Sequence, residues 1–228
     1  MKVQVVKNVL EANAVIAEKN RDVFRKAGVL ALNLISSPGS GKTTLLEKTL
    51  VALKPEKAAV IVGDLETTRD ADRVKPFAAD VVQINTGMSC HLYANQVNES
   101  LKNMKLVGLD YVFIENVGNM VCPGEFDLGE NLKVILYSLP EGDDKVAKYP
   151  TIFRAADIVL LTKMDLQPIL TFDMKRIEKD LRRLNGHVPL VRISATQGSG
   201  MAEWLQWLKT QRKSGLEKRA KAIVDLKE

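Results

Sequence analysis

Ser36-Ser37-Pro38-Gly39-Ser40-Gly41-Lys42-Thr43 lies between an apolar run of strand length, residues 29–35, and a segment, 43–54, whose leucines recur at helical spacing. Glycines let consecutive backbone N–H groups converge on a phosphate, and the N-terminus of a helix adds the positive end of its dipole. In this context Lys42 is expected to reach the β- and γ-phosphates, and the Thr43 hydroxyl to ligate Mg²⁺. The stretch therefore predicts a nucleoside triphosphate site.

The rest of this loop is expected to contribute through its backbone and through the start of the helix. The further nucleotide-binding residues predicted here are Gly39, Ser40, Gly41 and Thr44. Ser36 stands where the usual pattern begins with glycine, so the turn at that point must be one that serine can adopt.

Apolar segments of strand length alternate with helical patterns through the rest of the chain. Strands are predicted at residues 29–35, 57–62, 80–85, 109–118, 132–139, 157–161 and 189–193. Helices are predicted at residues 8–27, 43–54, 90–105, 173–184 and 202–211, and 141–149 is expected to be a polar loop. This alternation predicts an α/β fold, a three-layer P-loop NTPase with a mostly parallel central sheet flanked by helices. We expect an N-terminal helical segment at 1–28, a GTPase domain at 29–213 and a basic tail at 214–228.

Two acidic residues follow predicted strands and are the candidates for catalysis beside Lys42. Asp64 begins a charge-dense loop at 63–73, where a Mg²⁺- and γ-phosphate-sensing switch is expected, and it would contact Mg²⁺ or position the attacking water. The strand predicted at 109–118 ends in Glu115-Asn116-Val117-Gly118. Glu115 would hold Mg²⁺ through water, while Gly118 lets the backbone meet the γ-phosphate. Arg69 and Arg73 could touch a phosphate or form solvated ion pairs.

The base-recognition residues come from the last two predicted strands. Thr162-Lys163-Met164-Asp165 follows one strand, and Ser194-Ala195 follows the next. A carboxylate can accept two hydrogen bonds from N1–H and N2–H₂ of guanine, whereas adenine offers no such pair of donors. Asp165 has that role, with the Lys163 stem along the base and the Ala195 backbone N–H near O6. The pattern favours GTP over ATP.

Cys90, His91 and Cys122 come just after strands whose carboxyl ends share one sheet edge with the phosphate loop. Two thiolates and an imidazole suit Zn²⁺, Ni²⁺ or copper, and three ligands leave a position for water or for a second copy of the chain. The alternative is that the cysteines are small buried hydrophobes and the histidine is structural. The other histidine, His187, is interpreted as structural.

Bulk composition limits the classes of function. The net charge is +5, and residues 209–228, with seven Lys or Arg and three Asp or Glu, carry +4 of it. The remainder is near neutral, which argues against a broad nucleic-acid-binding face. No run is long enough to span a bilayer, so no membrane association is expected, and two cysteines without a signal peptide favour a reducing cytoplasm.

Taken together, the Ser-Ser-Pro-Gly-Ser-Gly-Lys-Thr-Thr, Gly-Asp-Leu-Glu-Thr, Cys90-His91-Leu92, Glu-Asn-Val-Gly-Asn with Cys122-Pro123, and Thr-Lys-Met-Asp motifs resemble the HypB family. These GTPases deliver nickel during maturation of nickel–iron hydrogenases. The resemblance covers roughly residues 31–207. It implies a GTP-dependent homodimer that binds GTP or GDP, Mg²⁺ and Ni²⁺ or Zn²⁺, with Cys90, His91 and Cys122 as the metal site at or near the subunit interface. It also implies handover with a HypA-type nickel protein and a hydrogenase large-subunit precursor.

The chain departs from some members of that family. No cysteine precedes Ser36 and no histidine-rich segment is present, so neither a separate N-terminal nickel site nor nickel storage is expected. The related urease GTPase carries Cys-Pro-His, whereas Gly124 follows Pro123 here. Two alternatives stay open: a GTPase that delivers another metal or cofactor, of urease- or cobalamin-associated type, and a zinc-stabilised module without catalysis.

Overall fold

The structure, a computed structural model, describes residues 2–65 and 67–225, with side chains described for 8–65 and 67–217. Seven strands in this part of the chain form one sheet in the order β3-β2-β4-β1-β5-β6-β7, and every neighbouring pair is parallel. The strands are β1 (Leu30–Ser36), β2 (Ala58–Asp64), β3 (Asp80–Asn85), β4 (Tyr111–Glu115), β5 (Leu132–Ser138), β6 (Ile158–Thr162) and β7 (Leu190–Arg192).

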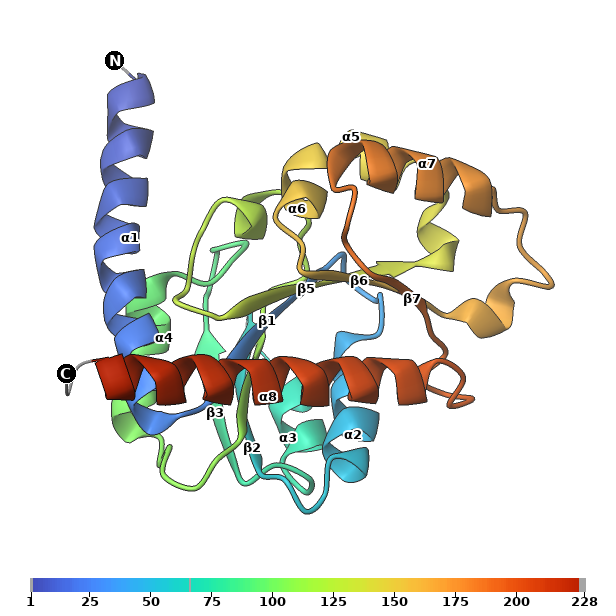
Figure 1. Ribbon diagram of the computed structural model, residues 1–228. Coiled ribbons are helices and arrows are strands. Elements are labelled where there is room, and N and C mark those ends of the chain that lie inside the picture. The colour runs from blue at the N-terminus through green and yellow to red at the C-terminus, as the bar shows by residue number, and fades with distance from the viewer. Residues whose placement is uncertain (1, 66, 226–228) are drawn as a thin grey trace.

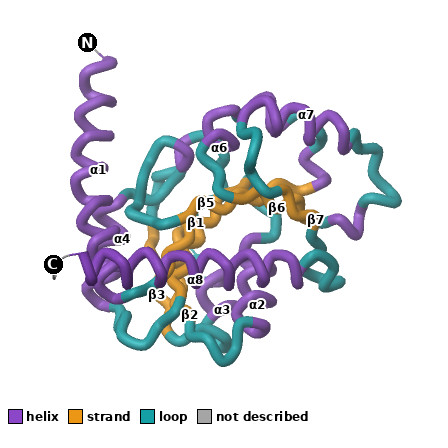
Figure 2. Tube along the Cα trace, in the orientation of Figure 1, coloured by secondary structure: helices purple, strands orange, loops and turns teal. Residues whose placement is uncertain are grey.

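Helices cover both faces of this sheet and give the three-layer arrangement that the alternating pattern predicts (Figures 1 and 2). One face packs on α2, α3 and α8, and the other packs on α1 and α4 at one end and on α6 and α7 at the other. The helices are α1 (Lys2–Ala27), α2 (Lys42–Ala52), α3 (Arg69–Val74), α4 (Ala94–Asn103), α5 (Lys145–Lys148), α6 (Pro150–Arg154), α7 (Met174–Leu184) and α8 (Met201–Asp225), with single 3₁₀ turns η1 (Cys122–Gly124), η2 (Leu139–Glu141) and η3 (Met164–Leu166).

Strand β1 lies at the centre of the sheet, and all of its residues are buried. Such a strand is in contact with helices on both faces, which explains its nearly continuous apolar sequence. The chain leaves β1 toward β2 on one side and reaches β5 on the other, so the strand order reverses beside β1. Ligands of open parallel sheets bind at such a point, at the carboxyl ends of the strands. The fold therefore places the site at the end of β1.

Helix α1 ends at Ala27, and Gly28 stops it as the sequence predicts. Gly28 adopts a positive φ of 71°, and the Val29 N–H donates to the Phe24 carbonyl, which closes the helix end. The C-terminal half of α1 packs against α4, whereas Figure 1 shows its N-terminal half rising clear of the sheet. The helix begins at Lys2, earlier than the Asn8 expected from sequence.

Other boundaries differ from those predicted. The strand expected at 109–118 spans Tyr111–Glu115, and the helix expected from residue 90 begins at Ala94, so Cys90 and His91 lie in a loop. Short helices interrupt both predicted loops, α3 in residues 63–73 and α5 in 141–149. Helix α8 continues across the boundary expected after residue 213, and residues 226–228 of the expected tail lie outside the described residues, as does Glu66.

Within the described residues, none of the helices combines the length and the apolar character that a bilayer-spanning helix needs.

Candidate functional site

The loop between β1 and α2 is shaped as a phosphate-binding loop. Gly39 and Gly41 both have positive φ angles, 72° and 94°, and no atom lies within 4 Å of where a Cβ would be at either position. These positions therefore need glycine for backbone conformation and not for space. Ser36 belongs to β1 with extended backbone, which explains why serine is accepted where the pattern usually has glycine.

Lys42 is buried in this loop, in the position expected for the phosphate-binding lysine. Its ammonium donates to the Ser36 hydroxyl over 2.9 Å, and Ser36 in turn donates to the Ser37 carbonyl over 2.7 Å. Burial lowers the pKa of Lys42, while nearby carboxylates, Glu115 foremost, act in the opposite direction. A phosphate would supply the counter-charge that this buried ammonium needs.

Thr43 and Glu115 meet at the floor of the same cavity. The Thr43 hydroxyl donates to Glu115 Oε1 over 2.7 Å, and Glu115 Oε2 is buried without a hydrogen-bond partner among the described residues. Burial raises the pKa of Glu115 to about 7, against the charge of Lys42 and the hydrogen bond from Thr43. A buried carboxylate oxygen without a partner, beside a hydroxyl, fits a hard cation that prefers oxygen ligands such as Mg²⁺.

A cavity of about 560 Å³ opens above these residues at the carboxyl edge of the sheet. Asp64 lies across it at the end of β2, where its carboxylate accepts from the Leu65 N–H over 2.6 Å and from the Thr67 hydroxyl over 2.5 Å. The lining includes Gly39, Gly41, Lys42, Thr43, Thr44, Asp64, Glu115, Gly118 and Lys163. The residues predicted to bind phosphate and Mg²⁺ therefore lie in one cavity.

A second cavity of about 260 Å³ continues from the first and shares Gly41, Thr44 and Lys163 with it. Its wall includes Ser40, Asp165 and Ala195, three of the residues predicted to bind nucleotide. Ser194 is fully buried behind this wall, and its hydroxyl donates to Asp165 Oδ1 over 2.5 Å. Ser194 therefore orients Asp165.

Lys163 has an unusual backbone conformation at the junction of the two cavities. It is the non-glycine residue with positive φ, 59°, in the described part of the chain. Such a conformation is uncommon for a long side chain and concentrates at functional sites. Here it turns the chain from β6 into η3, which carries Asp165.

Two residues that support the phosphate loop were not predicted to do so. Glu141, expected in a polar loop, lies in η2, where its Oε1 accepts from the Ser40 hydroxyl over 2.7 Å and from the Ser138 N–H over 2.9 Å. Arg73 pairs with Glu47 over 2.7 Å and donates to the Thr44 hydroxyl over 3.0 Å. Because these contacts join segments far apart in sequence, no local pattern could reveal them.

Cys90, His91 and Cys122 are brought together at the same edge of the sheet. Their candidate ligand atoms all lie within 4.8 Å of one another. The two sulfurs are 3.2 Å apart, and His91 Nδ1 lies 3.6 Å from the Cys90 sulfur. The grouping supports the metal hypothesis over the alternative of separate buried cysteines, because Cys90 is exposed and Cys122 is half-buried.

The electrostatics of this group also suit a metal. The hydrogen bond with Cys90 raises the pKa of the Cys122 thiol, so a metal that binds both sulfurs as thiolates would displace a proton from this pair. Burial lowers the pKa of His91 and so favours the neutral ring, which is the form that binds metals. Two sulfurs and one imidazole form a soft donor set that fits Ni²⁺ or Zn²⁺.

The metal group and the nucleotide cavity are joined through the segment after β4. Asn116 is buried, and its Oδ1 accepts from the N–H groups of Val117 and Leu92 over 3.0 and 3.1 Å. Leu92 directly follows His91, and its side chain fills the space where a Cβ at Gly63 would lie. Gly118 packs against Pro38 of the phosphate loop, where an added Cβ would be 3.0 Å from the proline.

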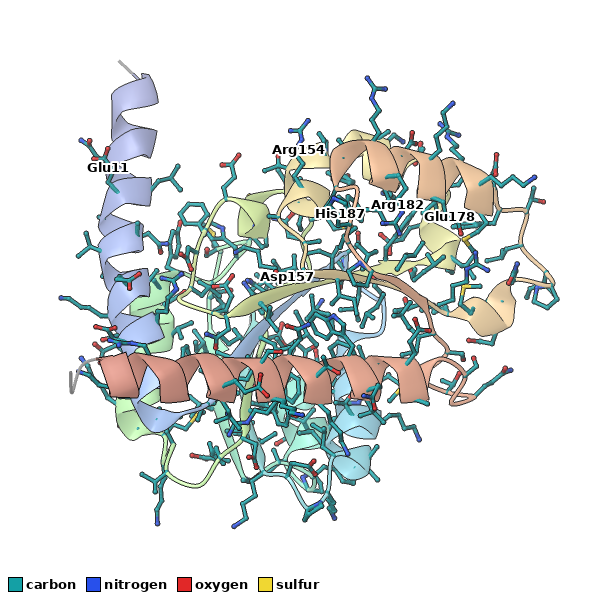
Figure 3. All side chains as sticks on the ribbon, in the orientation of Figure 1. Glu11, Arg154, Asp157, Glu178, Arg182 and His187 are labelled. Atoms are coloured by element: carbon teal, nitrogen blue, oxygen red, sulfur yellow. The ribbon has the colours of Figure 1, made fainter. Side chains whose placement is uncertain are left out.

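His187 lies in the connection between α7 and β7 with an exposed side chain (Figure 3). The guanidinium of Arg182 spans this connection through the carbonyls of Gly186 and Val188, both at 2.9 Å. Among the described residues, the group of candidate metal ligands does not include His187.

Comparison with known proteins agrees with this geometry. The profile of the family described as "CobW/HypB/UreG, nucleotide-binding domain" matches residues 30–192. Hydrogenase maturation factor HypB of Escherichia coli strain K12 is 48% identical over 206 residues, covering 90% of this chain and 71% of that protein. Hydrogenase/urease maturation factor HypB of Helicobacter hepaticus is 41% identical over 214 residues, covering 92% and 88%.

A solved structure extends the similarity to the whole fold. HypB from Helicobacter pylori, crystallised in complex with nickel, superposes with a TM-score of 0.85 at 37% identity, covering 89% of this chain and 96% of that one. Sequence and fold thus agree over nearly the same residues. The chain belongs to the HypB family of hydrogenase maturation factors, within the wider CobW/HypB/UreG group of nucleotide-binding P-loop proteins.

Proposed function

We propose that this protein is a GTP-hydrolysing metallochaperone that binds nickel or zinc and couples its GTP state to nickel insertion into a hydrogenase precursor. The observation that carries the proposal is the segment after β4. It begins at the nucleotide cavity with Glu115 and Gly118, and it reaches Cys122 four residues later, beside Cys90 and His91.

The residues around the nucleotide cavity have separate roles in binding and hydrolysing GTP. Backbone N–H groups of the phosphate loop and the Lys42 ammonium bind the phosphates, and Asp165 selects guanine. Thr43, Asp64 and Glu115 would hold Mg²⁺, which neutralises charge on the transferred phosphoryl group. Asp64, which lines the same cavity, would also orient the attacking water. The Gly118 backbone would meet the γ-phosphate.

Coupling follows from the shared segment. Loss of the γ-phosphate removes a partner of Gly118, so residues 115–122 can relax. Cys122 would then move relative to Cys90 and His91, and Asn116 would transmit the change to Leu92 through the hydrogen bond between them. A change of about 1.4–2.8 kcal/mol in metal binding free energy, ~10–100-fold, is enough for loading in one state and release in the other.

The expected partners come from the family. We expect a GTP-dependent homodimer with the metal group at or near its interface, because three ligands leave a coordination position open. Handover is expected with a HypA-type nickel protein and a hydrogenase large-subunit precursor, in the cytoplasm.

Titration of the purified protein with Ni²⁺ and Zn²⁺, in GDP and in a non-hydrolysable GTP analogue, tests the proposal. Nickel affinity is expected to differ between the two nucleotide states and to be lost in Cys90→Ala, with oligomeric state recorded throughout. Tight metal binding that ignores the nucleotide would instead identify a structural site, as in the zinc-stabilised alternative.

Urease maturation is a second candidate, because the Helicobacter hepaticus relative is named a hydrogenase/urease maturation factor. Gly124 in place of the histidine of Cys-Pro-His argues against a dedicated urease GTPase. Affinity capture from cells that contain both enzymes, followed by identification of the bound precursor, separates the two.

A further inference from the structure

Two aromatic rings hold the imidazole of His91 in place. The centroid of the Tyr93 ring lies 4.4 Å from that of His91, the Phe126 ring lies at 4.1 Å, and Tyr93 meets Phe126 edge-on at 5.2 Å. Tyr93 belongs to the segment that leads from Cys90 to α4, and Phe126 to the segment that follows Cys122. The orientation of His91 therefore depends on how these two segments lie relative to each other.

Helix α1 fixes both segments through one buried side chain. Asn13 accepts a hydrogen bond from the Ala94 N–H over 2.9 Å, and it donates to the Asp127 carbonyl over 2.7 Å. Ala94 directly follows Tyr93, and Asp127 directly follows Phe126. One amide thus joins the residues next to both rings, and both of its polar atoms are used.

The rest of α1 locks the same two segments. Asn20 donates to the Ala94 and Leu128 carbonyls over 2.8 and 2.9 Å, and Arg21 pairs with Asp127 over 2.6 Å. Gly129 lies so close to α1 that an added Cβ would be 2.3 Å from the Ala17 carbonyl oxygen. This close approach makes α1 a fixed support for the residues after Cys122.

From this arrangement we infer that Asn13 is a positioning residue for the metal site, which it serves by holding Tyr93 and Phe126 against His91. The inference rests on the proposed metal-binding function. It extends the site beyond its three ligands to a helix on which no ligand lies. Outer groups that orient a metal-binding histidine commonly change metal affinity when they are removed.

The test is a nickel titration of the full chain, monitored by thiolate-to-nickel absorption, in Asn13→Ala with and without His91→Ala. We expect Asn13→Ala to weaken nickel binding on the order of tenfold and to alter the absorption bands. In the His91→Ala background, Asn13→Ala should add nothing, because the ring it positions is gone.

Two asparagines serve as matched controls. Asn8→Ala changes an exposed asparagine of the same helix, and Asn98→Ala removes a 2.8 Å bond to Asn20 without touching either residue bonded to Asn13. Both should keep nearly wild-type nickel affinity. If Asn13→Ala does not fold, Asn13→Asp replaces it, since a carboxylate still accepts from Ala94 but cannot donate to Asp127. Because a carboxylate oxygen then faces the Asp127 carbonyl oxygen, this variant is expected to weaken nickel binding by about tenfold or more.

Two results would overturn the inference while leaving the metal site intact. One is wild-type nickel affinity in Asn13→Ala. The other is an equal loss of nickel affinity on Asn13→Ala with His91 present and with His91→Ala, which would mean that Asn13 acts on the fold in general. If His91→Ala itself keeps wild-type affinity, the proposed ligand set is wrong, and the positioning role of Asn13 is wrong with it.

Discussion

The nucleotide cavity and the metal group lie at one edge of the sheet but are held in different ways. Lys42, Thr43 and Ser40 of the phosphate loop each have a side-chain hydrogen-bond partner, at 2.7–2.9 Å. The two cysteines contact each other, and Cys90 also contacts His91. The support for His91 comes from rings whose segments are fixed by α1. The nucleotide cavity is built from the phosphate loop, the start of α2 and the ends of neighbouring strands.

This difference matters for function. A cavity whose side chains are already hydrogen-bonded in place can bind phosphate with little rearrangement, which favours nucleotide affinity that does not depend on the metal site. Ligands on separate loops can move apart when one of these loops relaxes. The comparison therefore predicts that the nucleotide site survives loss of the metal ligands, whereas the metal site responds to the nucleotide.

The largest effect is expected from removing a metal ligand. Four-ligand zinc sites bind with about 10–16 kcal/mol, so loss of one thiolate should cost about 3 kcal/mol, or more than 100-fold in affinity. Cys122→Ser should show this loss in a nickel titration and keep wild-type GDP affinity by calorimetry. An equal loss of GDP affinity would show that the two sites share their support.

The reciprocal change is Lys42→Ala. The ammonium makes charge-assisted bonds to the phosphates, so its loss should cost about 3 kcal/mol of GTP binding, ~100-fold, and abolish hydrolysis. Nickel affinity without nucleotide should be unchanged. A nickel affinity that fell in parallel would contradict independent construction of the two sites.

Base selection gives a somewhat smaller effect. Asp165→Asn removes one of the two acceptors for guanine and should weaken GTP binding about tenfold to 100-fold. The new amide can donate to a carbonyl at C2, so xanthosine triphosphate should bind the variant better than GTP does. Competition between the two nucleotides measures this, and an unchanged preference for GTP would place the guanine contact elsewhere.

Asn116→Ala is expected to change the coupling between the two sites more than it changes the affinity of either site for its own ligand. It removes the acceptor for the Leu92 N–H, so the difference in nickel affinity between GDP and GTP-analogue states should shrink by about tenfold at most. Asn33→Ala is the control, because it removes the partner of the Asn116 Nδ2 and a bond to Glu130, both at 3.2 Å, but leaves the bond between Asn116 and the Leu92 N–H in place. Equal shrinkage in both variants would point to the general packing of this segment.

Asp157, which is labelled in Figure 3, lines neither nucleotide cavity and is not in the metal group, so it gives the smallest effect. Burial raises its pKa above the ordinary 3.8, against a hydrogen bond from the Lys133 N–H. The folded protein then binds more protons than the unfolded chain between 3.8 and the raised pKa, so its free energy of unfolding falls as pH rises through that window. Asp157→Asn should flatten this fall in denaturant titrations and leave nickel and GTP affinity unchanged. If the free energy of unfolding of Asp157→Asn fell as steeply with pH as that of the wild type, another titrating group would be responsible for the fall.

The seven strands, the parallel sheet and the phosphate loop could be predicted because each depends on residues close together in the sequence. The start of α4 could not be predicted in this way. A helix from Cys90 was expected, but Tyr93 is extended and the helix begins at Ala94. This leaves Cys90 and His91 in a loop, where they can approach Cys122.

Support from distant segments also escaped prediction. Glu141 reaches Ser40 across 101 positions, and Asn13 reaches Ala94 across 81. Such contacts depend on how helices and strand ends pack, and nothing in the neighbouring residues distinguishes Asn13 from an ordinary polar residue on a helix. The candidate ligands could be predicted from the sequence, whereas the residues that hold them in position could not.

The central claim is that the nucleotide and the metal bind to coupled sites, and linkage gives its most direct test. Affinity for a non-hydrolysable GTP analogue, relative to GDP, is measured by calorimetry with and without saturating nickel. Nickel affinity in the analogue state differs from nickel affinity in the GDP state by about 10–100-fold if the sites are coupled. Coupling then predicts that saturating nickel changes the ratio of analogue affinity to GDP affinity by that same factor. A ratio unaffected by nickel would contradict the claim.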